Sequence, residues 1–323
     1  MKQRNIFTKL AIAVVLGGCL AACSDDDKPV IIDANGEKWQ VTSAGGFFFT
    51  YDEDGYLTSI RDNTTTYNVQ KDKFVVSGFY KGSSVNAEFT FDKNNNITKV
   101  VESETGFDND GNYTAEMTLD YTYDSDQRLK SCTGTSKWQQ EPGYYENATA
   151  TINYGWGSNQ LTVSYNGTSS GYEGKDDYWN NNYNNTFVYT LGSQPNRSKQ
   201  LPYYMTSSML QTPLEGGEDF ELGSILAVLG LFGYGPEYLP TGYSRTYMEN
   251  GREKWSDNYV FSFTQNSNGT LMQEKTGDKT ISSNDNGFNY IYTPTRAEGV
   301  ATQSLMELLY NSMKRTPHRE RKQ

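Results

Sequence analysis

Residues 51–60 read YDEDGYLTSI: an aromatic residue, a run of turn-forming residues with a glycine, and then aliphatic residues. Related stretches occur at 87–100, 117–132, 149–165 and 260–276. The aromatic residues before the turns are Tyr51, Phe91, Tyr123, Tyr154 and Phe263, and the aliphatic residues after them are Leu57, Ile97, Leu129, Leu161 and Leu271. Because Asn, Asp and Gly tolerate the positive φ of tight hairpin turns, the stretch predicts a β-hairpin that the chain uses repeatedly.

The sequence on both sides of these turns alternates between apolar and polar residues. From Ala115 to Tyr123 every second residue is apolar, and the residues between them are polar. This period of two predicts strands with one dry face and one wet face. We expect about ten strands in 39–166 and about five more in 244–292. The predicted fold is all-β, an antiparallel meander of about 14–16 strands in a curved or barrel-like sheet.

The segment 167–241 breaks this pattern. Its first part, GTSSGYEGKDDYWNNNYNN at 167–185, is predicted to be a polar loop rich in aromatic residues, followed by one strand at 187–190. An apolar run then has acidic residues before it and glycines and a proline after it, which predicts a short buried helix at about 218–232. A second helix is expected at about 301–313, where four apolar residues share one face. We predict one domain, 38–313, and a disordered basic tail, 314–323.

The composition excludes several classes of function. The chain has 323 residues, 14% of them aromatic, a mean hydropathy of −0.74 and a net charge of −11. With no basic stripe before the last ten residues, nucleic acid is not an expected partner. The one histidine, His318, lies in the tail, so neither a histidine-based catalytic centre nor a histidine zinc site is expected. The loop FDNDGNY at 107–113 lacks the glycine and the acid of a calcium loop, since Tyr113 and Leu119 hold those positions. We predict no catalytic residue, no metal and no cofactor.

The N-terminal segment has the pattern of a secretory signal peptide. Three basic residues precede LAIAVVLGGCL, an apolar core too short to span a membrane, and the core ends in Leu20-Ala21-Ala22-Cys23. This end resembles the lipobox of bacterial lipoproteins. The resemblance implies that 1–22 is a signal peptide and that Cys23 is the site of lipid attachment, with the membrane as partner. The alternative is a soluble secreted protein.

The next segment, 23–37, is predicted to be an acidic tether. Its SDDDKP run resembles the export signal of Bacteroidota-type lipoproteins, which implies the outer face of the outer membrane; the periplasmic face is the alternative. The chain is similar to a family of uncharacterised Bacteroidota lipoproteins. The features that carry this resemblance are the lipobox, the acidic run, the hairpins, the helical insertion and Tyr238-Leu239-Pro240. That resemblance implies a porin-like β-fold and no assigned activity. The turns also resemble the YD repeats of bacterial surface and toxin-shell proteins.

A membrane-spanning barrel is the alternative to a water-soluble sheet, because outer-membrane strands also alternate. Such chains usually end on an aromatic strand, whereas this chain ends in RTPHRERKQ. A lipid anchor would also be redundant on a spanning barrel. The sequence therefore favours a water-soluble curved or barrel-like sheet on a lipid tether.

Aromatic residues near predicted turns and loops are the candidate ligand-binding residues. Their rings can stack on sugars while nearby Asn and Asp side chains form hydrogen bonds. They are Trp138, Trp156, Trp179, Tyr172, Tyr178 and Tyr183, with Tyr144 and Tyr145 nearby. The alternative is that Tyr simply coats a β-surface. We expect a non-catalytic lipoprotein that binds an extracellular glycan or protein. A structural or accessory envelope protein is the first alternative, and a hydrolase with two carboxylates is the second.

Overall fold

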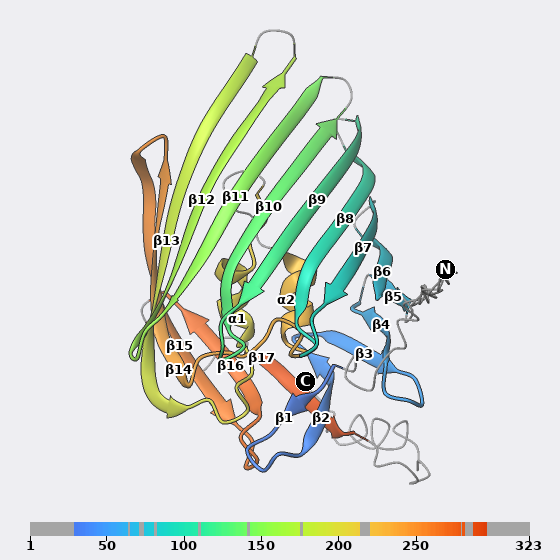
Figure 1. The fold of residues 1–323 in the computed structure, drawn as a ribbon, viewed down its shortest axis with the longest axis vertical. Helices are drawn as coiled ribbons and strands as arrows, with labels where there is room; N and C mark the ends of the chain where they lie inside the picture. Colours follow the sequence, from blue (N-terminus) through green and yellow to red (C-terminus); the bar gives the residue numbers. More distant parts are fainter. Residues whose placement is uncertain are drawn as a thin grey trace, which may run out of the picture.

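The computed structural model describes residues 29–63, 65–70, 74–80, 83–108, 111–140, 143–174, 177–213, 220–278, 280–281 and 287–295. Within these residues the chain forms seventeen strands and two short helices (Figure 1). The strands are β1 (Ile31–Ile32), β2 (Lys38–Ala44), β3 (Phe47–Tyr51), β4 (Leu57–Arg61), β5 (Thr66–Gln70), β6 (Val75–Tyr80), β7 (Ser83–Phe91), β8 (Ile97–Asp108), β9 (Gly111–Tyr123), β10 (Leu129–Gln140), β11 (Tyr144–Trp156), β12 (Gln160–Glu173), β13 (Asp177–Pro195), β14 (Tyr238–Glu249), β15 (Arg252–Gln265), β16 (Leu271–Gly277) and β17 (Phe288–Pro294). The helices are α1 (Tyr203–Met209) and α2 (Glu221–Ala227).

The strands close into a barrel. Each strand from β2 to β17 pairs antiparallel with the next one, and β17 returns to pair with β2, where Tyr290 lies opposite Ala44. Apart from β1, which adds two residues beside β2, all described strands belong to this ring. The all-β antiparallel meander is therefore confirmed, and its sixteen-stranded ring is at the upper end of the expected number.

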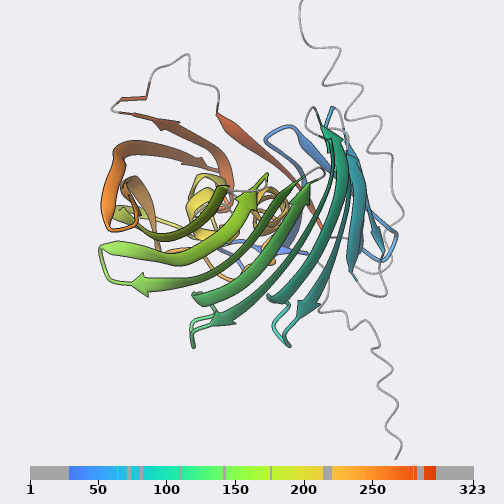
Figure 2. The ribbon, with the colours of Figure 1, turned by 90° about the horizontal axis from the view of Figure 1, so that it is seen from above.

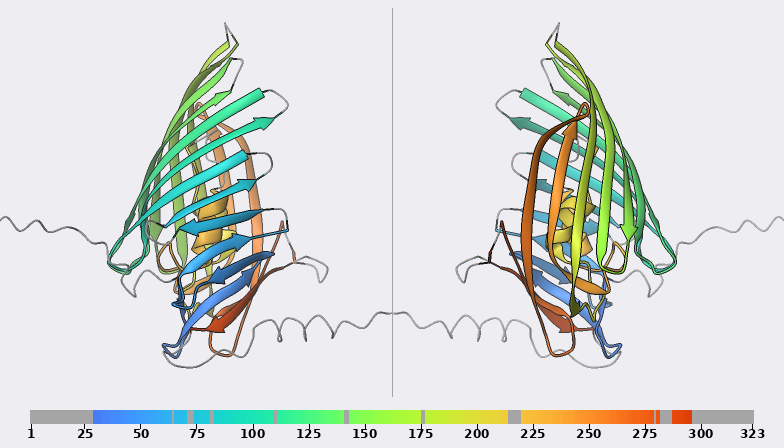
Figure 3. Two further views of the ribbon diagram at one scale, coloured as in Figure 1. Left: turned by 90° about the vertical axis from the view of Figure 1, so that its right-hand side faces the viewer. Right: turned by 90° about the vertical axis from the view of Figure 1, so that its left-hand side faces the viewer.

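The barrel wall is taller on one side than on the other (Figure 3). Strands β3 to β5 have 5 residues each, whereas β8 has 12 and β13 has 19. We call the end formed by the β8–β9, β10–β11 and β12–β13 hairpins the tall end. The opposite end, where β7–β8 and β9–β10 are joined, is the corner end.

Five turns share one geometry that accounts for their acidic residues. They begin at Asp33, Asp52, Asp92, Asp124 and Asn266. In each turn, the backbone amide of the first residue donates to the carbonyl of the fifth residue. The amide of the fourth residue donates to the carbonyl of the first residue. In the turn at Asp52, the carboxylate also accepts the amides of Asp54 and Tyr56 at 3.0 and 2.9 Å. The fourth residues all have positive φ: Gly36 (84°), Gly55 (89°), Asn95 (64°), Gln127 (61°) and Gly269 (89°). The predicted turn chemistry is therefore confirmed at four of the five stretches found in the sequence. The fifth turn, between Trp156 and Gln160, differs, because there the Gly157 amide donates to the Gln160 carbonyl.

Both helices lie inside the barrel (Figure 2), and their apolar side chains belong to the same buried core as those of the strands. Met205 of α1 and Leu226 of α2 are fully buried, and the Phe232 ring lies edge-on to Tyr121 of β9. The predicted buried helix exists, but it covers Glu221–Ala227 rather than 218–232. After it, Gly230 takes a positive φ, and the carbonyl of Leu231 accepts the amide of Ile97. The rest of the apolar run is thus an irregular, buried segment bonded to the wall.

Three expectations from the sequence need correction or fall outside the described residues. The segment 167–185 is not a loop, since it forms the second half of β12 and about the first half of β13. The fold also begins within the predicted tether 23–37, because β1 pairs with β2 and the Trp39 indole donates to Asp33 at 2.9 Å. The signal peptide 1–22, Cys23, the helix 301–313 and the tail 314–323 lie outside the described residues.

Candidate functional site

The outer face of the tall strands is polar. Its side chains bond to each other across strands, as Asn184 does with Asn166 at 2.7 Å and Thr149 with Thr168 at 3.0 Å. The outward residues of β10 and β11 below the tall end are Lys130, Ser131, Thr133, Thr135, Lys137, Gln139, Asn147, Thr149, Thr151 and Asn153. The exposed large hydrophobic residues of the described chain are scattered over β1, β3, β8, β13, β15, β16 and β17. On the described strands these residues form no continuous apolar band of the kind that lipid-facing strands carry.

Neither described helix is both long and apolar enough to cross a membrane.

The six aromatic residues singled out from the sequence lie in strands, and they divide between the two faces of the barrel wall. Trp138 of β10, Trp156 of β11, and Trp179 and Tyr183 of β13 occupy inward positions. Tyr172 of β12 and Tyr178 of β13 occupy outward positions, opposite each other in register. The six therefore do not form one site.

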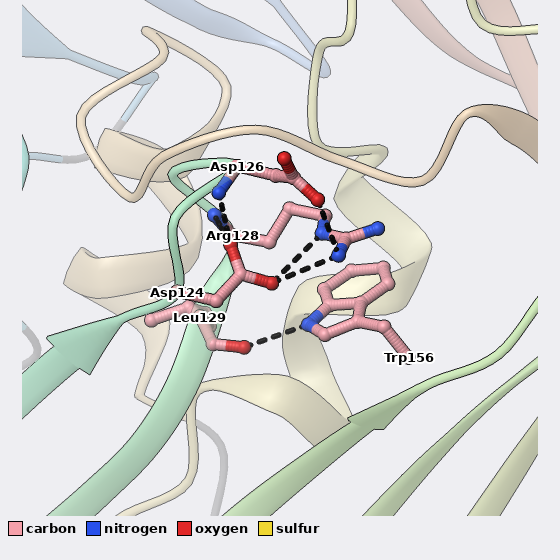
Figure 4. A network of polar contacts seen from close by, with 5 residues as sticks. All are labelled: Asp124, Asp126, Arg128, Leu129 and Trp156. Atoms are coloured by element: carbon pink, nitrogen blue, oxygen red, sulfur yellow. Dashed lines mark hydrogen bonds and ion pairs between the residues drawn. The ribbon is translucent and has the colours of Figure 1, made fainter.

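Trp156 holds the corner end together (Figure 4). Its indole N–H donates to the carbonyl of Leu129 at 2.7 Å, and the Arg128 guanidinium lies 5.2 Å from its ring. Arg128 in turn pairs with Asp124 and Asp126, both at 2.9 Å. These contacts tie the end of β11 to the backbone that follows the β9–β10 turn.

Tyr183 is also part of the packed interior. Its side chain is buried in the core cluster, and its hydroxyl lies 3.4 Å from the Ser169 hydroxyl and accepts the Asn181 amide at 3.2 Å. Of the six residues, Trp156 and Tyr183 are thus accounted for by the fold.

The outward residues form a row at the tall end. Tyr145 of β11 lies opposite Tyr172, and Tyr172 lies opposite Tyr178. The ring centroids are 5.7 and 6.0 Å apart, and Tyr178 is 73% exposed. We call these three residues the tyrosine strip.

Polar residues continue this outer surface beside the tyrosine strip. The next outward row consists of Asn147, Ser170 and Asn180, again in register. A flat-lying molecule on this surface would meet aromatic ring faces first and amide and hydroxyl groups next to them.

The inner face at the tall end carries a second group of aromatic and acidic residues. One register row runs across β8–β13 and contains Glu104, Ala115, Trp138, Glu146, Gly171 and Trp179. The next row toward the corner end contains Glu102, Met117, Ser136, Ala148, Ser169 and Asn181. We call these two rows the inner wall.

Aromatic rings lie flat along this inner wall. Trp138 stacks on Tyr113 with centroids 4.6 Å apart and 12° between the planes, and Trp179 lies 5.3 Å from Tyr144. The Trp179 ring lies against Gly171, where an added Cβ would come within 2.5 Å of the indole. Glycine at that position therefore lets the ring cover the neighbouring strand.

Carboxylates alternate with these rings. The Tyr113 hydroxyl donates to Glu104 at 2.7 Å, and the Tyr144 hydroxyl donates to Glu146 at 3.0 Å. Glu146 is only 2% exposed. Burial, and then the charge of Glu104 nearby, raise the pKa of Glu102 to about 7.

The sequence did contain a signal for these acids. In β8 and β11, Glu102, Glu104 and Glu146 stand in phase with apolar residues, at positions that otherwise face the dry interior. A charged residue on the dry face of a strand is the pattern that could have pointed to the inner wall.

One further buried acid has a structural role. Glu274 of β16 accepts the backbone amides of Tyr203 and Tyr204 at 2.7 and 3.0 Å, together with the Tyr290 hydroxyl. It thereby binds the start of α1 to the wall. The described residues contain no group of three His, Cys, Asp or Glu side chains placed to hold a metal ion.

Searches against protein-family models and against curated proteins find no match. Solved structures that are similar include two crystal structures of porin-like proteins. One, from Bacteroides uniformis ATCC 8492, is 16% identical, with 82% of this chain and 94% of that chain covered and a TM-score of 0.42. The other, from Bacteroides vulgatus ATCC 8482, is 11% identical, with 83% and 99% covered and a TM-score of 0.46. These values support no conclusion about activity, and the barrel rests on the strand pairing of the chain itself.

Proposed function

We propose that the chain is a non-catalytic, lipid-anchored envelope protein that binds an extracellular glycan on the tyrosine strip. In this proposal Cys23 carries the lipid, and the barrel stands in water on the outer face of the outer membrane.

The polarity of the two barrel faces supports a barrel that stands in water. In β9, Met117 and Leu119 are buried inside, whereas Glu116 and Asp120 are exposed outside. A bilayer-spanning barrel would instead bear a lipid-facing apolar band on its outside. In addition, α1 and α2 occupy the interior, and their apolar side chains belong to the same core as those of the wall.

The observation that carries the glycan proposal is the register of the tyrosine strip. Three tyrosines stand side by side on three adjacent strands, so their rings span about 10 Å at roughly 4.8 Å per strand. Aromatic faces offer an apolar, electron-rich surface on which the C–H bonds of a sugar ring can pack. Asn147 and Asn180 in the next row supply hydrogen-bond donors and acceptors for sugar hydroxyls.

A glycan array tests this proposal. The Tyr172→Ala and Tyr178→Ala variants should each weaken binding by about two- to tenfold, since an aromatic stacking contact contributes about 0.5–1.5 kcal/mol. Ile291→Ala, which removes an exposed apolar side chain of β17, should bind as the parent does. Unchanged binding in both tyrosine variants would refute the assignment, and no binding by the parent would favour the structural alternative.

One observation favours the hydrolase as a second candidate. Glu102 and Glu104 are two residues apart on one strand face, so their Cα atoms are about 7 Å apart. Side chains at that Cα spacing can bring their carboxyl groups to the separation of about 5–10 Å that glycoside hydrolysis requires, and a raised pKa suits a general acid. Release of reducing sugar from a bound glycan, abolished in Glu102→Gln, would establish this candidate in place of the non-catalytic one.

A further inference from the structure

We propose that the inner wall is a second binding site, separate from the tyrosine strip, for a ligand that carries a primary ammonium group on an apolar or aromatic body. The ammonium would bind among Glu102, Glu146 and Ser136, and the body would lie on the rings of Trp138 and Trp179.

A buried hydroxyl without a partner points to a ligand at this place. Ser136 is 3% exposed, and its Oγ has no hydrogen-bond partner. It faces inward between Met117 and Ala148 in the same register row, one strand from each. Leaving a buried polar group unpaired is unfavourable, so such a group in a folded protein calls for a missing partner. An N–H donor from a ligand would satisfy it.

The charges around Ser136 select a cation. Glu102 lies two strands away in the same row, and Glu146 lies diagonally across on the neighbouring strand. Among the described inward residues of β8–β13 there is no Lys or Arg. On β14, the Arg245 guanidinium is already paired with Asp257 at 3.1 Å. Buried carboxylates without a cation are costly, and a bound ammonium would offset that cost.

The carboxylates keep capacity for such a ligand. Glu104 and Glu146 each accept one tyrosine hydroxyl, and an ionised carboxylate has about four acceptor positions. The two tyrosine hydroxyls donate and so orient the carboxylates without neutralising them. An ammonium with its three N–H donors matches this set of acceptors.

The aromatic rings select an organic cation rather than a metal ion. Trp138 with Tyr113, and Trp179 with Tyr144, lie on either side of Glu146 along the inner wall. Ring faces attract a nearby cation and also pack against a hydrocarbon body. The described residues offer no three-carboxylate cluster for a metal, which agrees with an organic ligand.

Calorimetric titration with 2-phenylethylamine and with its neutral counterpart 2-phenylethanol tests the proposal at neutral pH. The amine should bind saturably and at least roughly tenfold more tightly than the alcohol, as expected for a charge-assisted contact in a partly buried site. Equal affinities, or no saturable binding of the amine, would overturn the proposal.

Variants separate this site from the tyrosine strip. Glu146→Gln and Ser136→Ala, both close in size to the parent residues, should weaken amine binding and leave glycan binding unchanged. Glu116→Gln, on the exposed outer face of β9, is the matched control and should change neither. If Glu146→Gln fails to fold, as judged by circular dichroism, Ser136→Ala decides the matter. Amine binding that is unaffected in Ser136→Ala and in every folded glutamate variant would place the ligand elsewhere.

Discussion

Glu274 offers a test of how the helical plug is held in the barrel. The Glu274 carboxyl is fully buried, and its pKa is raised from 4.5 to about 7. Burial is the largest cause, and the hydrogen bonds from the Tyr204 amide, the Tyr290 hydroxyl and the Tyr203 amide oppose it. The difference between 4.5 and about 7 corresponds to about 3 kcal/mol.

The direction of the pH dependence of stability follows from the number of protons that each state binds. In the unfolded chain this carboxyl loses its proton near pH 4.5, whereas in the folded protein it keeps the proton to about pH 7. Between these values the folded state binds more protons, so the free energy of unfolding falls as the pH rises. Glu274→Gln removes the titration and keeps an acceptor oxygen for the amides of α1. As the pH rises from 4.5 to 7, the free energy of unfolding of the variant should therefore increase by about 3 kcal/mol relative to that of the parent.

Equilibrium unfolding in urea at several pH values and constant ionic strength measures this difference. The titration of Glu102 is present in both proteins and cancels. Glu253→Gln, an exposed carboxyl of β15, serves as the control and should show no such trend. If the difference in unfolding free energy between Glu274→Gln and the parent stays constant across this pH range, burial does not determine the pKa of this carboxyl, and the argument is refuted.

Three further predictions concern the corner end and the inner wall. Trp156→Phe keeps an aromatic ring but loses the hydrogen bond to Leu129, so thermal unfolding should show a loss of about 1 kcal/mol, and Trp156→Ala should lose about 3–5 kcal/mol. Asp124→Ala removes the acceptor of two backbone amides and of Arg128 and should cost about 1–3 kcal/mol, whereas Asp126→Ala, which is more exposed, should stay within about 0.5 kcal/mol. If the inner wall binds 2-phenylethylamine, its affinity should rise as the pH increases through about 7, because Glu102 must lose its proton to attract the ammonium, and a flat profile from pH 6 to pH 8 would contradict this.

The strand corners could be predicted from the sequence because their cause is local. An aspartate that accepts nearby amides and a fourth residue with positive φ lie within five residues, as in Asp52–Tyr56. Closure of the barrel could not be predicted in the same way. It depends on the pairing of Tyr290 with Ala44, which are far apart in the chain.

The missed strands and the missed helix have physical reasons. At inward positions of β12 and β13 near the tall end stand Gly167, Ser169 and Asn181, so the alternation of apolar and polar residues disappears there. The α1 sequence YYMTSSM offers only Met205 and Met209 as an apolar pair one turn apart, which is too little to predict a helix. The backbone amide at its start is bound by wall residues, Glu274 and Tyr290, that are distant in the sequence.

The sequence singled out aromatic residues at 138–183 but not their arrangement in the barrel. The parity of each position in its strand decides whether a ring faces inward or outward. Tyr172 and Tyr178 join Tyr145 outside, whereas Trp138 and Trp179 face the interior. A one-residue difference in register would exchange these faces, and the sequence alone did not fix the register.

The most direct test of the central claim, a barrel with a dry interior and a wet exterior, uses a variant without its lipid. Cys23→Ser should abolish lipid attachment, and the released protein should stay folded and soluble in buffer without detergent. Added lipid vesicles should leave it in the supernatant, with its circular dichroism unchanged. Aggregation without detergent, or insertion into vesicles with protection from protease, would contradict the account.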